Sequence, residues 1–324
     1  MTPTLPGLHH VTAITALPQQ NVDFYSGVLG LRLVKLTVNF DDPTSYHLYY
    51  GDELGSPGTI MTFFAWPGAP RGRVGPPQVT TTSFAVPEGS LGYWMERLQQ
   101  HLVAAQPGHR LGEEFLSFTD PDGIRLEIVA TPETGRHVPT GGPVPAEHAL
   151  RGFHSVTLSE EGYERTARLL SEELGFHAVG SEGTRFRYRA GAGEQAATVD
   201  LLCVPDARRG GMGAGVVHHV AFRTPDDAQQ LAWRERISEL GLNVTPLIDR
   251  TYFHSIYFRE PGGVLFEIAT EPPGFTADEA EEELGTRLQL PPWLEPSRQE
   301  LERVLPPLSL PQWHGAGARQ PTHT

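Results

Sequence analysis

The fold is decided by four short apolar segments of the chain, which read GLHHVTAI at 7–14, TTTSFAV at 80–86, GFHSVTL at 152–158 and VVHHVAF at 216–222. Aligning them places four residues in one equivalent position: His10, Ser83, Ser155 and His219. Successive copies of this position lie 73, 72 and 64 residues apart. Such regular spacing indicates one structural unit used four times, and a unit that cannot bury its own apolar face must stack against its copies.

Each copy continues in the same way. A helical pattern follows over residues 22–29, 91–102, 163–174 and 228–240. Three of these helices end in Leu-Gly, where glycine suits the left-handed conformation after a helix; the glycines are Gly30, Gly175 and Gly241. Strand-like runs come next, in the first copy over 31–38, 46–50 and 60–66. Each unit therefore reads β-α-β-β-β, which predicts an α+β fold of four βαβββ modules.

Pairs of such modules are expected to close curved, half-barrel sheets with their helices outside. We place modules one and two in a domain of residues 1–140, and modules three and four in a domain of residues 141–272. Residues 273–324 are rich in Pro and Glu, and we expect them to form a C-terminal arm that packs onto the surface. The tail after Gly315 is expected to be disordered.

Composition excludes several classes of protein. The formal net charge is −14 and no long basic run occurs, which argues against a nucleic-acid partner. Cys203 is the only cysteine, so an intrachain disulfide and cysteine-rich zinc or iron–sulfur sites are excluded. No apolar run is long enough to span a membrane, and the first residues do not resemble a signal peptide. We therefore expect a cytoplasmic protein.

The last strand of each module also carries an equivalent position. Counting five residues back from the proline that closes each strand gives Thr62, Glu127, Asp200 and Glu267. Each predicted module therefore has two positions for a polar group, one on its first strand and one on its last strand. The pairs in modules one to four are His10 with Thr62, Ser83 with Glu127, Ser155 with Asp200, and His219 with Glu267.

The chemistry depends on which modules share a half-barrel. If modules one and four pair, His10, His219 and Glu267 converge as two histidines and one carboxylate, the set that binds non-haem Fe(II) and leaves coordination sites open. The other half-barrel then has no imidazole and is a poor transition-metal site. If neighbours pair instead, His219 and Glu267 meet Asp200 and Ser155, which favours a harder metal. The first pairing is the more coherent chemically.

Glu267 lies between apolar residues of a strand, where a carboxylate is costly unless it is paired or binds a metal. Glu127 has similar neighbours without a histidine, so for it we expect hydrogen bonds or an ion pair. The histidines occur as doublets, His9-His10 and His218-His219. Adjacent strand residues face opposite sides, so only one of each doublet can be a ligand, and spacing alone does not choose which.

Three motifs point to a known family. They are the Leu-His-His-Val-Thr start at 8–12 and the turns Asp-Pro-Asp-Gly at 120–123 and Glu-Pro-Gly-Gly at 260–263. With the module order, they resemble the glyoxalase/bleomycin-resistance/extradiol-dioxygenase superfamily, whose fold is named vicinal oxygen chelate. More narrowly, the chain resembles the branch of ring-cleaving hydroquinone dioxygenases. The resemblance covers roughly residues 7–272 and extends into the C-terminal arm.

The resemblance implies that modules one and four pair, and that the second histidine of each doublet is a ligand. The implied metal ligands are His10, His219 and Glu267, and the implied metal is Fe(II), with Mn(II) as the alternative. It also implies catalytic roles around the metal for five residues: His9, Thr12, His218, Arg250 and Tyr257. A hairpin across 260–263 would place Tyr257 about level with Glu267.

The expected function is therefore an Fe(II)-dependent dioxygenase that opens a hydroxylated aromatic ring with O₂, as in the degradation of aromatic compounds. The substrate would be a small diol of the hydroquinone or catechol type. A glyoxalase-like or thiol-transferase-like metalloenzyme is the alternative within the same fold. A resistance protein that sequesters a small molecule is the non-enzymatic alternative. The open sheet edges are compatible with a homodimer.

Overall fold

The computed structural model describes residues 5–132, 138–139, 141–191 and 196–311. The domain boundary placed at residue 140 and the tail after Gly315 lie outside these described residues, so both stay predictions. Within the described part of the chain, no helix combines the length and apolar character that crossing a membrane requires.

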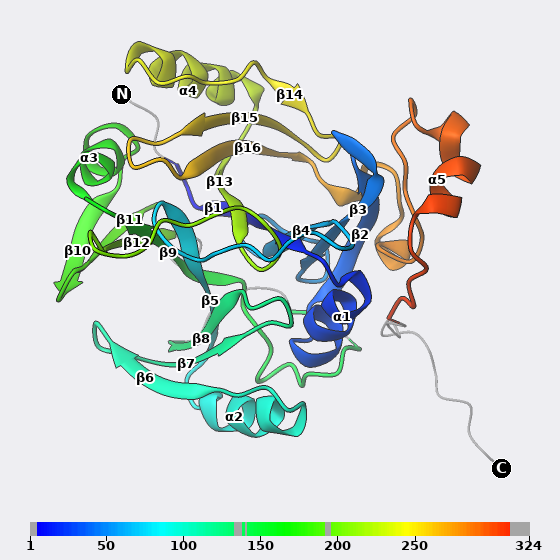
Figure 1. Ribbon diagram of the computed structural model, residues 1–324, viewed down its shortest axis with the longest axis horizontal. Helices are drawn as coiled ribbons and strands as arrows, with labels where there is room; N and C mark the ends of the chain where they lie inside the picture. Colours follow the sequence, from blue (N-terminus) through cyan, green and yellow to red (C-terminus); the bar gives the residue numbers. More distant parts are fainter. Residues whose placement is uncertain (1–4, 133–137, 140, 192–195, 312–324) are drawn as a thin grey trace.

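Four modules follow one another along the chain, each with a first strand, a helix and three further strands (Figure 1). The first contains β1 (Leu8–Thr15), α1 (Pro18–Val22), β2 (Arg32–Asn39), β3 (Asp42–Gly51) and β4 (Ile60–Ala65). The second contains β5 (Gln78–Pro87), α2 (Leu91–Gln100), β6 (Gln106–Arg110), β7 (Glu113–Thr119) and β8 (Arg125–Thr131).

The third module contains β9 (Phe153–Glu160), α3 (Glu164–Arg168), β10 (His177–Glu182), β11 (Arg185–Ala190) and β12 (Ala197–Cys203). The fourth contains β13 (Val217–Thr224), α4 (Asp227–Glu239), β14 (Ile248–Asp249), β15 (Phe253–Arg259) and β16 (Leu265–Pro273). The chain ends in an arm with short 3₁₀ turns and α5 (Arg298–Val304). The βαβββ modules predicted from the repeats are confirmed.

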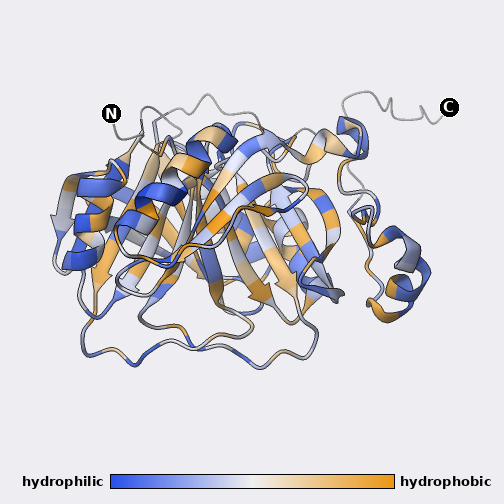
Figure 2. Ribbon diagram, turned by 90° about the horizontal axis from the view of Figure 1, so that it is seen from above, coloured by the Kyte–Doolittle hydropathy of each residue, from blue (hydrophilic) through white to orange (hydrophobic). Residues whose placement is uncertain are grey.

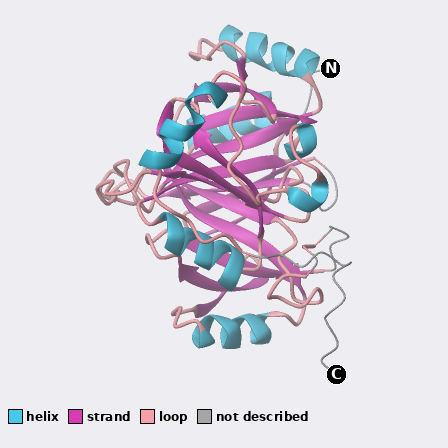
Figure 3. Cartoon of the chain, turned by 90° about the vertical axis from the view of Figure 1, so that its right-hand side faces the viewer, coloured by secondary structure: helices cyan, strands magenta, loops and turns pink. Residues whose placement is uncertain are grey.

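The strands form two curled sheets of eight. One has the order β14-β15-β16-β13-β1-β4-β3-β2, and the other β10-β11-β12-β9-β5-β8-β7-β6. Modules one and four therefore share one half-barrel and modules two and three the other, and pairing between neighbours is wrong. The joints are antiparallel, β1 with β13 and β5 with β9. Figure 3 shows the strands gathered inside with the helices around them.

The helices end where the sequence predicts. Gly30, Gly175 and Gly241 all have positive φ, at 71°, 76° and 75°, a conformation that costs glycine little because it lacks a Cβ. In modules one and three the helix changes to a π-helical turn, over Asp23–Val28 and Leu169–Glu173. The remaining helices bury one tryptophan each, Trp94 and Trp233, both fully buried. In Figure 2 the apolar residues lie mainly along the strands that these helices cover.

The C-terminal arm covers the edge strand of the half-barrel shared by modules one and four. The backbone N–H of Gln289 donates to the carbonyl of Leu36 on β2 at 2.8 Å, and Tyr46 on β3 donates its hydroxyl to the carbonyl of Pro306 at 2.9 Å. In Figure 1, α5 lies beyond β2 and β3. Because an exposed strand edge invites pairing with another chain, the arm protects this edge.

One buried charge fixes the arm to the sheet. Lys35 on β2 is the only lysine of the sequence and its side chain is fully buried. Its ammonium group pairs with Asp278 at 2.5 Å and with Glu279, both from the arm. It also lies 4.7 Å from the ring centre of Tyr252, within range of a cation–π interaction. A buried ammonium group without its partners would be strongly unfavourable, so arm and sheet depend on one another.

Replacing Lys35 should therefore destabilise the whole half-barrel. We expect Lys35→Ala to lower the free energy of unfolding by about 3–5 kcal/mol, because two acidic side chains lose their buried partner. Chemical denaturation measures this. Arg287→Ala is the matched control in the arm: its ion pair with Glu283 is more than half exposed, so about 0–1 kcal/mol is expected. A loss below about 1 kcal/mol for Lys35→Ala would contradict the assigned role.

A pair of buried carboxyl groups joins the module-four turn to the third module. The hydroxyl of Thr166 on α3 lies 2.7 Å from Glu160 and 2.6 Å from Glu260. Glu260 also accepts backbone N–H groups of Gly262 and Val264, at 2.6 and 2.7 Å. Burial, and then the proximity of Glu260, raise the pKa of Glu160 to about 8, so Glu160 holds the proton.

This pair should make stability depend on pH. In the unfolded chain Glu160 loses its proton near its ordinary pKa of 4.5, but in the folded chain near 8. The unfolded state thus binds fewer protons between these values, and stability should fall as pH rises from about 5 to 8. Glu160→Gln should flatten that fall and raise the melting temperature at pH 8. Exposed Glu161→Gln is the control; equal pH slopes in wild type and Glu160→Gln would count against the pair.

Candidate metal centre

Two histidines and one glutamate meet on the inner face of the half-barrel formed by modules one and four. They are His10 on β1, His219 on β13 and Glu267 on β16, and each is at least 96% buried. The Nε2 atoms of His10 and His219 are 3.2 Å apart. The Oε2 atom of Glu267 lies 3.2 Å from His10 Nε2 and 2.9 Å from His219 Nε2. The pairing of β1 with β13 brings the three together.

The neighbouring histidine fixes the ring of each candidate ligand. His9 Nε2 lies 3.2 Å from the carbonyl of Thr270, which can only accept, so His9 Nε2 carries a hydrogen. Burial, and then the proximity of His10, lower the pKa of His9 to about 3, so its ring is neutral and its Nδ1 is an acceptor. His10 Nδ1 then donates to His9 Nδ1 at 2.9 Å. The lone pair of His10 Nε2 is left facing Glu267.

The second doublet repeats this contact. His218 Nδ1 and His219 Nδ1 are 2.8 Å apart, and burial lowers the pKa of both rings, that of His218 to about 3. When His219 donates from Nδ1, its Nε2 is also a bare acceptor. His9 and His218 therefore lie behind the two rings and orient them, as groups around metal ligands commonly do.

The three converging atoms fit a metal ion. Oε2 of Glu267 has no hydrogen-bond partner although it is buried, while Oε1 accepts the hydroxyl of Ser255 at 2.5 Å. Donors bound at right angles about 2.1 Å from one ion lie about 3 Å apart, close to the observed separations.

A small pocket lies beside these three atoms. The lining residues that the sequence singled out are His10, Thr12, His219, Arg250 and Tyr257. Those that it did not single out are Asn39, Phe40, Asp41, His47, Tyr49, Phe64 and Phe253. A larger cavity lies in the other half-barrel, but the donor atoms, not the size of a cavity, locate the metal chemistry.

Tyr257 and Arg250 act as a pair on one wall of this pocket. Tyr257 lies opposite Glu267 in the β15–β16 register, as the predicted hairpin requires. Arg250 Nε donates to the Tyr257 hydroxyl at 3.3 Å, and its guanidinium also pairs with Asp41 at 3.1 Å. Burial, and then the proximity of Glu267, raise the pKa of Tyr257 well above its ordinary value, so the hydroxyl keeps its proton.

A chain of polar groups that the sequence analysis missed forms the opposite wall. The Tyr49 hydroxyl lies 2.9 Å from His47 Nδ1, and His47 Nε2 lies 2.5 Å from the Thr62 hydroxyl. Thr62 in turn contacts the hydroxyl of Thr12 at 3.4 Å. Burial raises the pKa of Tyr49 and lowers that of His47, so both are neutral. Tyr49 then donates to His47, and His47 donates to Thr62.

The corresponding carboxylates of the other half-barrel are neutralised by arginines. Glu127 accepts two hydrogen bonds from Arg110, at 3.0 and 2.6 Å, and one from Ser83 at 2.7 Å. Asp200 accepts hydrogen bonds from Arg187 and Arg185. The ion pair expected for Glu127 is therefore confirmed. Among the described residues, His10, His219 and Glu267 are the one group with metal-ligand geometry.

The half-barrels and the convergence of two histidines with one carboxylate define a protein of paired βαβββ modules with a candidate metal site. A family model described as "Glyoxalase/Bleomycin resistance protein/Dioxygenase superfamily" matches residues 7–128 and 152–268. The chain belongs to this superfamily, as the resemblance predicts.

Relatives with known names share most of their length with this chain. A Bacillus subtilis protein, MhqO, is named provisionally as a ring-cleaving dioxygenase; it is 49% identical, over 94% of this chain and 97% of its own. The "Chlorohydroquinone/hydroquinone 1,2-dioxygenase" of Sphingobium indicum is 39% identical, over 92% and 95%. A crystal structure from B. subtilis matches with a TM-score of 0.92 and 48% identity, over 96% and 100%. Glyoxalase I from Zea mays shares the fold, with a TM-score of 0.59 and 15% identity, over 82% and 92%.

The ligand set can be tested by metal content. We expect His10→Ala, His219→Ala and Glu267→Gln each to lose nearly all bound metal, because each removes one of three donors. His9→Ala should still bind metal, with an affinity weaker by about 10–100-fold. Elemental analysis of anaerobically prepared protein, with circular dichroism as a check on folding, measures this.

Glu127→Gln is the matched control, since Glu127 occupies the corresponding strand position in the other half-barrel. It should leave the metal content unchanged. Loss of metal from Glu127→Gln together with retention in Glu267→Gln would show that the site has been placed in the wrong half-barrel.

Proposed function

We propose that this protein opens the ring of a hydroxylated aromatic compound with O₂, at an Fe(II) ion held by His10, His219 and Glu267. The observation that carries the proposal is the convergence of two bare imidazole nitrogens and an unpartnered carboxylate oxygen in a buried pocket. The names of its relatives, ring-cleaving and hydroquinone dioxygenases, support the same reaction class. Mn(II) is the alternative metal for this donor set.

Fe(II) in such a triad would supply open coordination positions for reactants and a path for electrons from an electron-rich ring to O₂. The protein's own groups have to position the ring. Phe64 and Phe253 line the pocket, and Phe253 packs against His10 with ring centres 5.1 Å apart. These flat apolar surfaces favour an aromatic substrate over a charged aliphatic one.

Two polar walls face each other across the pocket and suit a diol. Tyr257, supported by Arg250, offers a proton-bearing hydroxyl on the side of Glu267. His47, Tyr49 and Thr12 present their polar chain on the other side. A diol with hydroxyls on opposite ring carbons can meet both walls. We therefore favour a hydroquinone over a catechol.

The entrance has to open for the substrate to enter. The free volume is about 30 Å³, room for about one water molecule. The turn between β2 and β3, which contains Phe40 and Asp41, is held over the pocket by the Asp41–Arg250 ion pair. Asp41 is 72% exposed at its side chain, so water weakens this pair and it can break at little cost. Closure of this turn over the bound substrate would exclude water and restore the hydrogen bond from Arg250 to Tyr257.

Labelled oxygen tests the reaction. Iron-loaded protein supplied with methylhydroquinone and ¹⁸O₂ should take up oxygen and yield an opened, acidic product that contains both labelled atoms. Catechol should react more slowly, because it reaches one polar wall only. Chelation of Fe(II) should abolish uptake, and ferrous salt with reductant should restore it. Glu267→Gln is the inactive control.

The glyoxalase class makes a different prediction. An iron-loaded protein that consumes no O₂ with either diol, but isomerises a glutathione adduct, would refute the dioxygenase proposal.

A further inference from the structure

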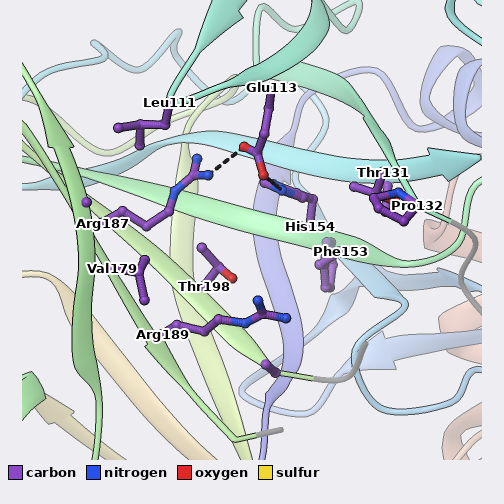
Figure 4. Close-up of a pocket in the computed structure, with 13 residues that line it drawn as sticks. Leu111, Glu113, Thr131, Pro132, Phe153, His154, Val179, Arg187, Arg189 and Thr198 are labelled. Carbon is purple, nitrogen blue, oxygen red and sulfur yellow. Dashed lines mark hydrogen bonds and ion pairs between the residues drawn. The ribbon is translucent and has the colours of Figure 1, made fainter. Parts of the chain in front are cut away.

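The two half-barrels enclose hollows of very different size. The hollow between modules two and three measures about 580 Å³ (Figure 4), whereas the pocket beside the candidate metal ligands measures about 30 Å³. Corresponding turns border both hollows: Leu111, between β6 and β7, lines the larger one, and Phe40, between β2 and β3, lines the smaller one. The C-terminal arm distinguishes the two turns, because in Figure 1 it lies beside β2 and β3 and away from β6 and β7.

One residue of the arm contacts the turn over the metal pocket. The ring of Trp293 packs edge to face against the ring of Phe40, with ring centres 5.6 Å apart and planes inclined at 74°, a favourable arrangement for two aromatic side chains. Among the described residues, Phe40 lines the pocket and Trp293 does not. Phe40 therefore stands between the pocket and the arm.

The arm presents Trp293 from a rigid turn. Pro291 and Pro292 precede it, and each proline ring fixes its own φ. The backbone N–H of Leu294 donates to the carbonyl of Pro291 at 2.9 Å, which closes the turn around Trp293. Leu290 is buried and Leu294 packs against the core, so the turn is anchored on both sides. Trp293 is thus a fixed surface against which the turn between β2 and β3 can close.

The tip of the β2–β3 turn is the part that can move. The ladder between β2 and β3 shifts register between Val38 and Asn39, and such an irregularity disrupts the ladder locally. The base of the turn is held by Asp42, which accepts the indole N–H of Trp66 at 2.8 Å. Residues 40–41, at the tip, are held by the contact with the arm and by the exposed ion pair described above. The tip can therefore lift while the strands stay in place.

We propose that Trp293 is a latch, which holds Phe40 over the entrance and so sets how often the metal pocket opens. The inference rests on the proposed function, since the latch serves the pocket in which that reaction would occur. The diol and O₂ would enter when Phe40 leaves Trp293, and renewed contact would close the pocket. A gate of this kind changes the rates of entry and exit by the same factor and leaves the binding equilibrium unchanged.

Metal exchange tests the latch without relying on the reaction. The closed pocket has room for about one water molecule, so a hydrated Fe(II) ion passes only when the pocket opens. Release of Fe(II) from the full-length protein to excess ferrozine is measured without O₂, and uptake by the metal-free protein is followed by stopped-flow fluorescence. Trp293→Ala should raise both rates roughly three- to tenfold, the effect of losing one aromatic pair, with the Kd for Fe(II) unchanged within about twofold.

Three further variants separate a latch from a general loosening of the fold. Trp293→Phe keeps an aromatic ring and should restore both rates to within about twofold of wild type. Val304→Ala is the matched control, because Val304 lies on α5 of the same arm and, like Trp293, is 56% exposed; both rates should stay at the wild-type value. Phe40→Ala should raise both rates, and Trp293→Ala added to it should change them little, because the partner ring is already gone.

The outcomes distinguish the latch from the proposed function. Wild-type exchange rates in Trp293→Ala, with Fe(II) bound normally, would overturn the latch and leave the proposed function standing. Faster release with unchanged uptake would also overturn it, because that result means weaker metal ligands and not a gate. The expected exchange rates without O₂ uptake on any diol would support the latch and refute only the reaction. A wild-type protein that binds no Fe(II) would refute the proposed metal site, and the latch with it.

Discussion

The antiparallel pairing of β1 with β13 is the contact on which the candidate metal site depends. It joins strands about two hundred residues apart in sequence and sets Thr12 opposite His219. Without it, two histidines from the first and fourth modules could not approach within 3.2 Å. The pairing buries both faces of both strands almost completely. Burial then removes water, which lowers the pKa of His219 and so favours its neutral form, the form that can bind a metal.

The second half-barrel shows what the same geometry does without histidine. Its carboxylates, Glu127 and Asp200, are also buried but are paired with arginines. A guanidinium group satisfies several carboxylate lone pairs at once, so no metal is needed for charge balance. The same fold therefore compensates the charge of its buried carboxylates differently in its two half-barrels. The larger cavity lies in this second half-barrel.

The repeat pattern predicted the modules and the glycines that end the helices, because these features follow from apolar periodicity and helix-end chemistry, which are local in sequence. The pairing of modules one with four is a long-range contact that the repeats left open; the chemistry of the donor set favoured it and the family resemblance implied it. The strand β10 was not located, since all six of its residues are exposed and show no apolar alternation. Lys35 was missed because its partners, Asp278 and Glu279, lie more than two hundred residues away.

His47 and Tyr49 were missed for a different reason. The sequence comparison followed only the first and last strands of each module, whereas these residues lie on β3, a middle strand. A signal was nevertheless present in the hairpin register. Tyr49 lies opposite Thr62 as Tyr257 lies opposite Glu267, so modules one and four place a tyrosine at corresponding positions. Extending the comparison to the middle strands would have found the first of these tyrosines.

Thr62 explains why the site is open on one side. It occupies in module one the position that Glu267 occupies in module four, and its hydroxyl is held by His47 at 2.5 Å. A second carboxylate there would add a fourth donor and cancel the remaining positive charge of a divalent ion. With threonine there, a divalent ion held by the three donors would keep one unit of excess charge and open coordination positions. In the proposed reaction, that charge would favour an ionised phenolic oxygen as a ligand. The polar chain through His47 to Tyr49 lies on the side where module one has threonine in place of a carboxylate, and this asymmetry between the two modules would leave room for reactants at the ion.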